Sequence, residues 1–313
     1  MKTSQLARFC AWSLGIVVFC SLPSYAESSP NFAIFETAQF RSEADQVFSP
    51  EQQRILTGLK QAKVVYLGET HDSPEDHQAQ LAIIQALHQQ NPQVAIAMEM
   101  FQRPYQEVVN RYLAGELTEA ELQAQSQYKQ RWGYDWEYYA PILRFAKANQ
   151  LPVIALNTPT EVIRKVSREG LNSLTPTERQ FIPPFSEIRT DNAEYRQMIR
   201  DIYDQAHHGH GSSRGFEKFF LAQVLWDETM AEGVVQFLQA QPDYQVVVLA
   251  GQGHVVYGYG IPSRVARRMS TAAFTQRSVL LSATKASLFQ PQTGDKPNSG
   301  NRQKIADYLW VIE

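Results

Sequence analysis

Several apolar runs of this sequence end abruptly in side chains that bind ligands or carry protons. Each run is short and rich in valine, isoleucine or alanine, and we interpret each as a buried strand. In an open α/β sheet, ligands bind in the crevice beyond the carboxyl ends of the strands. We therefore predict one shared site from the polar residues that follow these runs. They are Glu69 and His71 after residues 64–67, Glu99 after 94–98, Asn157 after 152–156, and His254 after 245–250.

Glu69 and His71 are the first candidates for chemistry. They are two positions apart just after a strand, so in an extended segment their side chains point to the same side and can share a ligand or a proton. The alternative is that His71 caps the helix that follows. His77, in the first turn of that helix, either turns back toward the site or is solvated.

Two further carboxylates fall where apolar side chains are expected. Glu99 closes an apolar run, and a buried carboxylate needs a partner such as histidine, arginine or a cation. Asp227 shares a helical stripe with Phe220 and Val224, on the face that should be apolar. Each is either a site residue or part of a structural ion pair. The neighbouring Glu228 falls closer to the polar side of the same helix.

His254 follows Gly251 and Gly253, which permit a tight turn and the close approach of a ligand. The plainer interpretation is a glycine-rich turn with an incidental histidine. The glycine spacing does not match a dinucleotide-binding fingerprint. The chain also lacks the Gly-x-Ser-x-Gly elbow and the His-Glu-x-x-His zinc helix, which disfavours several common enzyme classes.

Aromatic residues are concentrated between residues 132 and 139. Such a cluster is more often core than cofactor site, but tyrosine is a known axial ligand of ferric haem, and a porphyrin needs apolar walls. The histidine tract 207–210 is either a metal or haem ligand at the rim or simply solvated. The aromatic residues are Trp132, Tyr134, Trp136, Tyr138 and Tyr139.

The elements that must position these side chains alternate between strand and helix. Helical patterns over about 50–62, 72–90, 104–130 and 142–148 separate or follow the first strands, and another covers about 160–168. A polar, proline-rich segment at 171–189 and helices over 191–206 and 216–239 precede the strand at 245–250. We predict an α/β fold with a mixed, largely parallel sheet covered by helices, with a helical insertion and further strands at 278–282 and 308–312.

The first 26 residues have the pattern of a secretory signal peptide. Lys2 and Arg8 precede an uncharged run, 9–22, that is short for a membrane span, and small residues follow at 24–26. We expect cleavage there, an arm over 27–49 and one domain over 50–313, exported to the periplasm or cell exterior. Cys10 and Cys20, the two cysteines of the chain, both fall in the removed segment.

Charge and length limit the partners and the size of the fold. The 313 residues carry a formal net charge of −3, and no lysine- or arginine-rich face stands out, which argues against a nucleic-acid partner. With no disulfide expected in the exported chain, its stability must come from burial of a core. The length suffices for one large domain.

Several short motifs follow one another along the chain. They are Gly68-Glu69-Thr70-His71-Asp72, Met98-Glu99-Met100-Phe101, Tyr139-Ala140-Pro141, Ala155-Leu156-Asn157, Trp226-Asp227-Glu228-Thr229-Met230-Ala231, Ala250-Gly251-Gln252-Gly253-His254 and Gly260-Ile261-Pro262-Ser263-Arg264. Their order, over about residues 64–268, resembles the ChaN-like haem-binding uptake proteins. That family belongs to a superfamily with the Tiki, TraB and erythromycin-esterase-like proteins.

The resemblance implies an α/β sandwich with its site at the strand ends, and haem binding in iron acquisition, with haem held by a homodimer and ligated through tyrosine. A membrane-associated uptake partner is a further expectation. On this hypothesis Tyr139, or failing it Tyr134 or Tyr257, ligates ferric iron, and His254 or His71 ligates or hydrogen-bonds opposite. Arg264 and Arg164 would pair with the propionates.

The rival hypothesis, from other branches of the superfamily, is a hydrolase of the esterase or metallopeptidase type. Its catalytic residues would be drawn from the strand ends and the long helix, with Glu69 or Glu99 as general base and Asp227 orienting a histidine. A divalent metal, where one is used, would be held by a set of carboxylates and imidazoles. That set is Glu69, His71, Glu99 and His254.

Overall fold

The computed structural model describes residues 48–206, 212–271, 273–281 and 304–311. The predicted signal peptide, nearly all of the predicted arm and the histidine tract 207–210 lie outside the described residues. The chain divides into residues 1–40 and 41–313, and every described residue belongs to the second unit. None of the described helices is long and apolar enough to cross a membrane.

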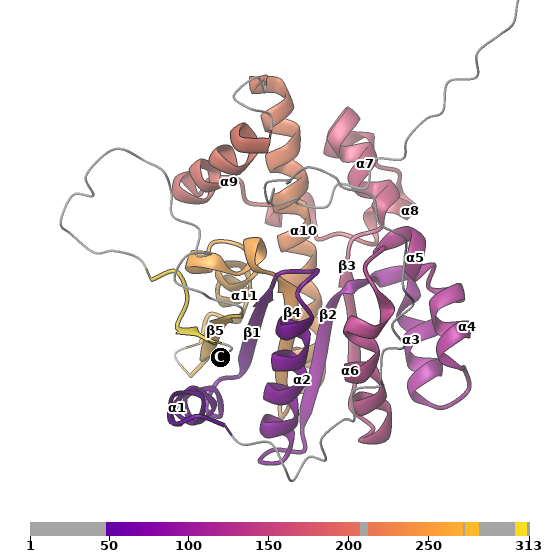
Figure 1. The fold of residues 1–313 in the computed structure, drawn as a ribbon. Coiled ribbons are helices and arrows are strands. Elements are labelled where there is room, and N and C mark those ends of the chain that lie inside the picture. Colours follow the sequence, from indigo (N-terminus) through magenta and orange to yellow (C-terminus); the bar gives the residue numbers. More distant parts are fainter. Residues whose placement is uncertain (1–47, 207–211, 272, 282–303, 312–313) are drawn as a thin grey trace, which may run out of the picture. The chain divides into compact units, whose positions relative to one another are not determined.

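A six-stranded sheet forms the centre of the fold, in the order β3-β2-β4-β1-β5-β6 (Figure 1). Every described strand pair is parallel, which confirms the α/β prediction and shows no antiparallel pair among the described strands. The strands are β1 (Val64–Glu69), β2 (Val94–Gln102), β3 (Val153–Asn157), β4 (Gln245–Gly251), β5 (Gln276–Leu280) and β6 (Tyr308–Leu309).

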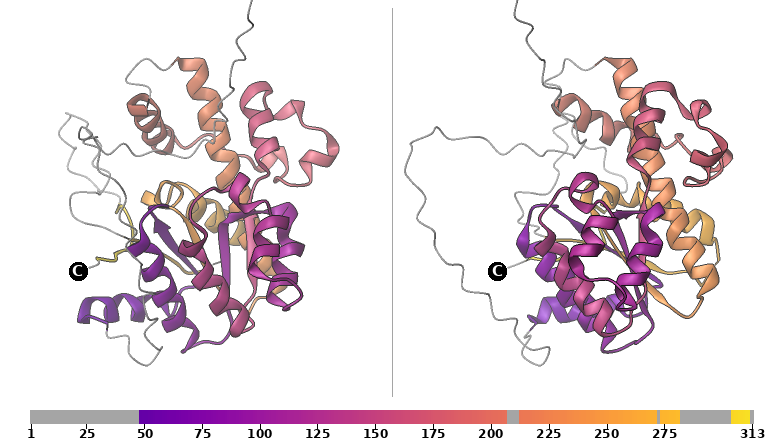
Figure 2. Two further views of the ribbon diagram at one scale, coloured as in Figure 1. Left: turned by 45° about the vertical axis from the view of Figure 1, so that its right-hand side comes forward. Right: turned by 90° about the vertical axis from the view of Figure 1, so that its right-hand side faces the viewer.

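Helices cover both faces of this sheet (Figures 1 and 2). One face packs on α1 (Pro50–Leu59), α2 (Pro74–His88), α3 (Gln106–Leu113) and α6 (Trp136–Ala148). The other packs on the second half of α10 (Ser213–Ala240) and on α11 (Ile261–Met269). All residues of β1, β2 and β4 are buried, as expected of parallel strands covered on both faces.

Local sequence explains where the first helices begin. Ser49 and Gln52 form a capping box around Pro50, which occupies the first position of α1. Ser73 caps α2 by accepting from the backbone N–H of Asp76, and Pro74 follows it at the first helical position. The helical pattern over 104–130 is interrupted at Gly115, which takes a φ of +83° and separates α3 from α4 (Glu119–Gln125). The short α5 (Tyr128–Arg131) follows α4.

The predicted helical insertion lies on the side of the carboxyl ends of the strands (Figure 1). It contains α7 (Thr160–Glu169), α8 (Pro176–Arg179) and α9 (Ala193–Ala206), and the first half of α10 joins it. Two small apolar clusters hold it together: one between α7 and α10, the other between α9 and α10. The insertion therefore stands directly over the edge at which the site was predicted.

Two sequence-based boundaries need correction. The strand predicted to end at Met98 continues to Gln102, although its pairing with β4 does end at Met98 and its register with β3 shifts after that residue. Glu99 thus lies within β2, at the point where the ladder to β4 stops. Helix α11 was not predicted at all, because a short arginine-rich segment after a glycine-rich loop carries little periodic signal.

Candidate functional site

Strand order brings the predicted residues to one place. Strand β4 lies between β1 and β2, and Glu69 is paired in register with Gly251. The segments that leave β1 and β4 and the end of the β2–β4 ladder therefore meet at one edge of the sheet. Glu69, His71, Glu99 and His254 converge there, although the first and last are far apart in the sequence.

Glu69 is a fully buried carboxylate surrounded by donors. Its Oε1 accepts from the Tyr139 hydroxyl at 2.6 Å and lies 2.8 Å from Nδ1 of His71. Its Oε2 accepts from Nε2 of Gln80 at 2.6 Å, and Nδ1 of His77 lies 3.7 Å away. Burial alone would raise the pKa of Glu69, but these hydrogen bonds and the two imidazoles lower it below its usual value. Glu69 is therefore ionised at neutral pH.

His71 presents the more open face of this pair. Its Nδ1 faces the carboxylate, so Nδ1 carries the proton, and within the described residues Nε2 makes no hydrogen bond. Its side chain is 18% exposed and its ring packs against Trp132 and Tyr134, with centroids 4.8 Å and 5.1 Å away. Burial would lower the pKa of His71, but Glu69 and Glu99 raise it above the usual value.

Glu99 lies between the two imidazoles. Its Oε2 accepts from the backbone N–H of Gly251 at 2.8 Å, and its Oε1 is 3.5 Å from Nε2 of His254. A Cβ at Gly251 would stand 2.8 Å from Nε2 of His71 and 3.8 Å from Oε2 of Glu99. Residue 251 is therefore the point where the two carboxylate–imidazole pairs meet, and a side chain there would displace the His71 ring.

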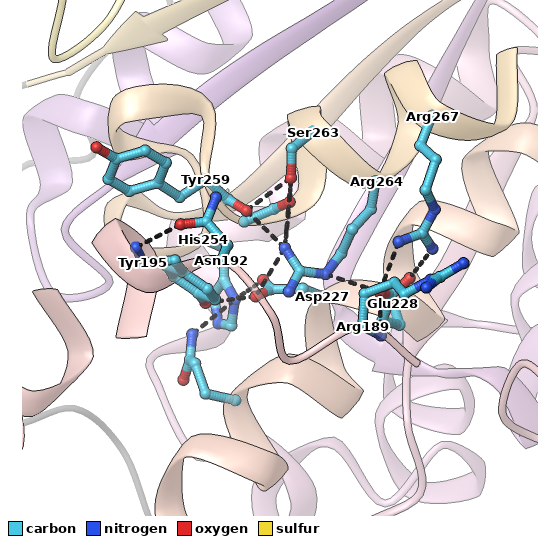
Figure 3. Close-up of polar contacts among 12 residues, drawn as sticks. Arg189, Asn192, Tyr195, Asp227, Glu228, His254, Tyr259, Ser263, Arg264 and Arg267 are labelled. Carbon is cyan, nitrogen blue, oxygen red and sulfur yellow. Dashed lines mark hydrogen bonds and ion pairs between the residues drawn. The ribbon is translucent and has the colours of Figure 1, made fainter. Parts of the chain in front are cut away.

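His254 is held from behind by Asp227 (Figure 3). Its Nδ1 lies 2.7 Å from Oδ1 of Asp227, and the other oxygen of that carboxylate accepts from the Tyr195 hydroxyl. Burial would lower the pKa of His254, but the charges of Glu99 and Asp227 and the hydrogen bond to Asp227 raise it. The carboxylate on the apolar stripe of α10 thus has a partner in the site.

Some buried polar atoms near the site lack a partner within the described residues, among them Oδ1 of Asn157 and Oε1 of Gln223. Nε2 of Gln223 lies 3.0 Å from Nδ1 of His254. Exchanging the oxygen and nitrogen of this amide would place an acceptor beside Nδ1, whose one proton already faces Asp227, and would put the amide nitrogen at the buried position of Oε1. Asn157, predicted as a strand-end residue, donates a hydrogen bond from its amide nitrogen to the backbone carbonyl oxygen of Glu99 at 2.9 Å.

The geometry does not favour Arg264 as a partner for a ligand carboxylate. This side chain is buried, lies 3.3 Å from Glu228 and 3.9 Å from Asp227, and donates to backbone carbonyls of its own turn (Figure 3). Glu228, predicted to lie near the polar side of α10, is fully buried and also pairs with Arg267 and Arg268. The predicted second arginine, Arg164, is exposed on α7.

The three candidate tyrosines differ in exposure. Tyr139 is fully buried and its hydroxyl is committed to Glu69. Burial and the charge of Glu69 hold its pKa well above the usual value, which opposes the phenolate form that iron prefers. Burial also raises the pKa of Tyr134 and of Tyr257, so exposure rather than acidity separates the three tyrosines. Tyr134 and Tyr257 are half-buried. Tyr257 has a φ of +55°, an uncommon backbone conformation, and its ring contacts that of Tyr259. The geometry therefore favours Tyr134 and Tyr257 over Tyr139.

The donor chemistry of the site suits haem better than a bare cation. Within the described residues, no three or more histidine, cysteine, aspartate or glutamate side chains are grouped to hold a metal ion, so a divalent metal is not supported. By contrast, His71 and Tyr134 are partly exposed donors with Trp132 beside them, an arrangement that fits the iron and the flat apolar face of a porphyrin.

Sequence reasoning missed three polar residues of this site. Gln80, Gln223 and Tyr195 lie on helices and contact Glu69, His254 and Asp227. Gln80 and Gln223 fall among apolar residues of α2 and α10 and are buried, a pattern that resembles that of Asp227. Tyr195 gave no signal, because a buried tyrosine is an ordinary core residue.

The fold and this site define a class. The chain is an α/β protein whose carboxylate–imidazole pairs meet at the carboxyl edge of a parallel sheet, beneath a helical insertion. Residues 55–265 match the family described as haem-binding uptake, Tiki superfamily, ChaN. The chain therefore belongs to this haem-binding family.

A solved structure shows the same fold. It is described as cofacial haem binding to ChaN of Campylobacter jejuni, is 20% identical and has a TM-score of 0.61; the match covers 82% of this chain and 90% of that one. A mutant of the erythromycin esterase EreC in its open conformation is 15% identical, with a TM-score of 0.44, over 74% of this chain and 72% of its own.

A plant protein is also similar in sequence. The chloroplastic protein RETICULATA-RELATED 5 of Arabidopsis thaliana is 27% identical over an alignment of 280 residues, and the alignment covers 83% of this chain. The chain spans 35% of the length of that relative.

Proposed function

We propose that the protein is an exported haem-binding protein that takes part in haem or iron uptake. The proposal is supported by membership of a haem-binding family and by the two aromatic rings, of Trp132 and Tyr134, that pack against His71. The observation that carries it is the position of His71 and Tyr134, two partly exposed donors for iron, against Trp132. Tyr134 or Tyr257 would ligate ferric iron, and His71 would ligate it or donate a hydrogen bond to the bound group.

The chain's own residues would prepare this site for haem. Glu69 holds Nδ1 of His71, which leaves Nε2, beside Gly251, as the nitrogen with a free lone pair and makes the imidazole more basic. Trp132, Tyr134 and Tyr138 offer aromatic area for an apolar macrocycle. Bound iron would contribute a Lewis-acidic centre that accepts these donors.

Haemin titration of the purified chain tests the proposal. We expect a saturable shift of the Soret band, with a weaker or altered spectrum in Tyr134→Phe or Tyr257→Phe. Tyr139→Phe should change the spectrum less than either variant, since its hydroxyl contacts Glu69 and acts on iron only through His71. Absence of a Soret shift, or a shift unchanged when all three tyrosines are replaced, would count against haem ligation.

Export and assembly belong to the same proposal. The pattern of residues 1–26 supports cleavage and export, and the family resemblance supports a homodimer around haem and an uptake partner at a membrane. Cell fractionation, N-terminal sequencing of the mature chain and light scattering with and without haemin test these points. Retention of residues 1–26 in mature protein from the cytoplasmic fraction would contradict export.

A second candidate, a hydrolase, is favoured by one observation: Glu99 lies between two imidazoles that carboxylates support from behind. Glu99 or His71 would take a proton from water as its oxygen attacks an acyl carbon. His254 would return a proton to the leaving group as the bond to that group breaks. Glu69, whose two oxygens already accept hydrogen bonds, suits an orienting role better than that of general base.

A screen of ester and peptide substrates, with and without divalent metal, tests this candidate. Activity that is lost in Glu99→Gln and in the double variant Glu69→Gln with His71→Ala would support it. Activity that survives both changes would refute the assignment of these residues.

A further inference from the structure

Tyr195 contributes to the candidate site from outside the sheet. It lies on α9, within the helical insertion, and its side chain is fully buried. Its hydroxyl donates to Oδ2 of Asp227, while Oδ1 of the same carboxylate faces Nδ1 of His254 at 2.7 Å. Nε2 of His254 then faces Glu99. Figure 3 shows the contacts from Tyr195 through Asp227 to His254. The contact of His254 with Glu99 continues this chain from α9 to the strand ends.

The surroundings keep the Tyr195 ring in place without help from its hydroxyl. The ring packs against Phe220, with centroids 5.8 Å apart, and the Arg264 guanidinium lies 5.2 Å from its centre. Arg264 is itself held by the carbonyl oxygens of Tyr259 and Gly260 and by Glu228. Removing the hydroxyl alone should therefore leave the packing intact and change only the hydrogen bond to Asp227.

The hydroxyl has a specific effect on the carboxylate. The Tyr195 hydroxyl and Nδ1 of His254 donate to different oxygens of Asp227, and the Arg264 guanidinium lies 3.9 Å from the oxygen that Tyr195 contacts. The two hydrogen bonds set the rotation of the carboxylate, and that rotation directs Oδ1 at His254. With Nδ1 occupied, the imidazole can present only Nε2 to Glu99 and to a ligand. Without the phenol, the carboxylate can turn and the ring loses its fixed orientation.

We propose that Tyr195 is a positioning residue that acts through Asp227 to hold His254 in one orientation, which makes the helical insertion part of the site. This inference rests on the proposed participation of His254 in function. It also assigns the insertion a task that neither haem binding nor hydrolysis by itself requires.

Nuclear magnetic resonance of the full chain with ¹⁵N-labelled histidine tests the proposal. The chain has seven histidines, and the His254 signals are identified by their loss in His254→Asn. In Tyr195→Phe, we expect the Nδ1–H proton of His254 to exchange with water about five- to tenfold faster than in the wild type, as loss of one such hydrogen bond implies. The ring ¹⁵N shifts should also move.

Tyr203→Phe is the matched control. Tyr203 lies on the same helix and is also buried, but it packs against Phe216 and Phe219. It should leave the His254 exchange rate unchanged. Asp227→Asn provides a second variant, in which the same acceleration is expected.

The proposal is overturned if Tyr195→Phe leaves the His254 signals and exchange rate at their wild-type values, or if Tyr203→Phe accelerates exchange equally. The measurement needs no haem and no substrate. A failed haemin titration would therefore overturn the proposed function while leaving this result readable.

Discussion

At the scale of single residues, the site depends on two glycines whose neighbours differ. A Cβ at Gly251 would meet the ring of His71 at 2.8 Å, and a side-chain ring can move aside. A Cβ at Gly260 would meet the backbone carbonyl of His254 at 2.2 Å, and backbone cannot yield without distorting the turn. The same substitution should therefore have different consequences at the two positions.

We expect Gly251→Ala to fold with a small loss of stability while displacing His71 from Glu69. Gly260→Ala should lower the free energy of unfolding by about 1–3 kcal/mol or more, the usual range for overpacking. Urea denaturation of both variants measures the difference, and the His71 ring ¹⁵N shifts report its displacement. Equal stability of the two variants would contradict the steric argument.

Residue-scale electrostatics also makes a prediction about pH. Asp76 is buried at the start of α2, where its Oδ2 accepts from the backbone N–H of Thr70 at 2.7 Å. Burial raises its pKa to about 7. A carboxyl whose pKa is raised in the folded state stabilises the fold below its unfolded value and loses that contribution as pH rises through the folded value.

Asp76→Asn should therefore gain stability relative to the wild type between about pH 4 and pH 8, by roughly 2–4 kcal/mol. The amide oxygen can still accept from Thr70, so the loop should keep its shape. Urea denaturation across this range measures the difference. A difference that does not change with pH would show that Asp76 does not titrate in this way.

At the scale of elements, the edge strand β3 is closed by a side chain. Gln106, the first residue of α3, donates from Nε2 to the carbonyl oxygen of Val153 at 2.8 Å and accepts at Oε1 from the N–H of Ala155 at 2.7 Å. The amide thus occupies backbone groups that a further strand would use. Open strand edges invite pairing with another chain.

Gln106→Ala should lower the free energy of unfolding by about 1–2 kcal/mol, since it leaves two backbone groups of β3 without their partner. It should also increase concentration-dependent association. Glu107→Ala, at the exposed neighbouring position, is the control and should change neither property. Denaturation and light scattering test this, and an unchanged Gln106→Ala variant would mean that the cap is dispensable.

The long helix α10 shows what a periodic pattern can and cannot indicate. The pattern identified the helix and placed Asp227 on its apolar stripe, which the structure shows to be buried. It missed that Glu228 is equally buried, because its arginine partners come from α11, an unpredicted helix. A buried charge is recognisable from sequence only when its partner is also known.

At the scale of the whole molecule, His71 and His254 make the stability of the fold depend on pH in the opposite direction from Glu69. The raised pKa values of His71 and His254 mean that their contributions are complete below the unfolded value and decline as pH rises through the folded values. The lowered pKa of Glu69 means that its contribution to stability is lost only in acid.

In His71→Gln, the free energy of unfolding should fall less as the pH is raised above neutral than it does in the wild type, because one of the two histidine contributions is gone. Thermal unfolding across this pH range measures the difference.

The sequence by itself determined the strands, the main helices and the polar residues at the strand ends, because an abrupt change from apolar to polar side chains is a local property. Only the tertiary structure decided that β4 lies between β1 and β2, so that Glu99 falls between His71 and His254. Strand order and the choice of hydrogen-bond partners depend on packing between distant segments. Neither hydrophobic periodicity nor residue spacing carries that information, which is why Tyr195 and the commitment of Tyr139 and Arg264 appeared only in three dimensions.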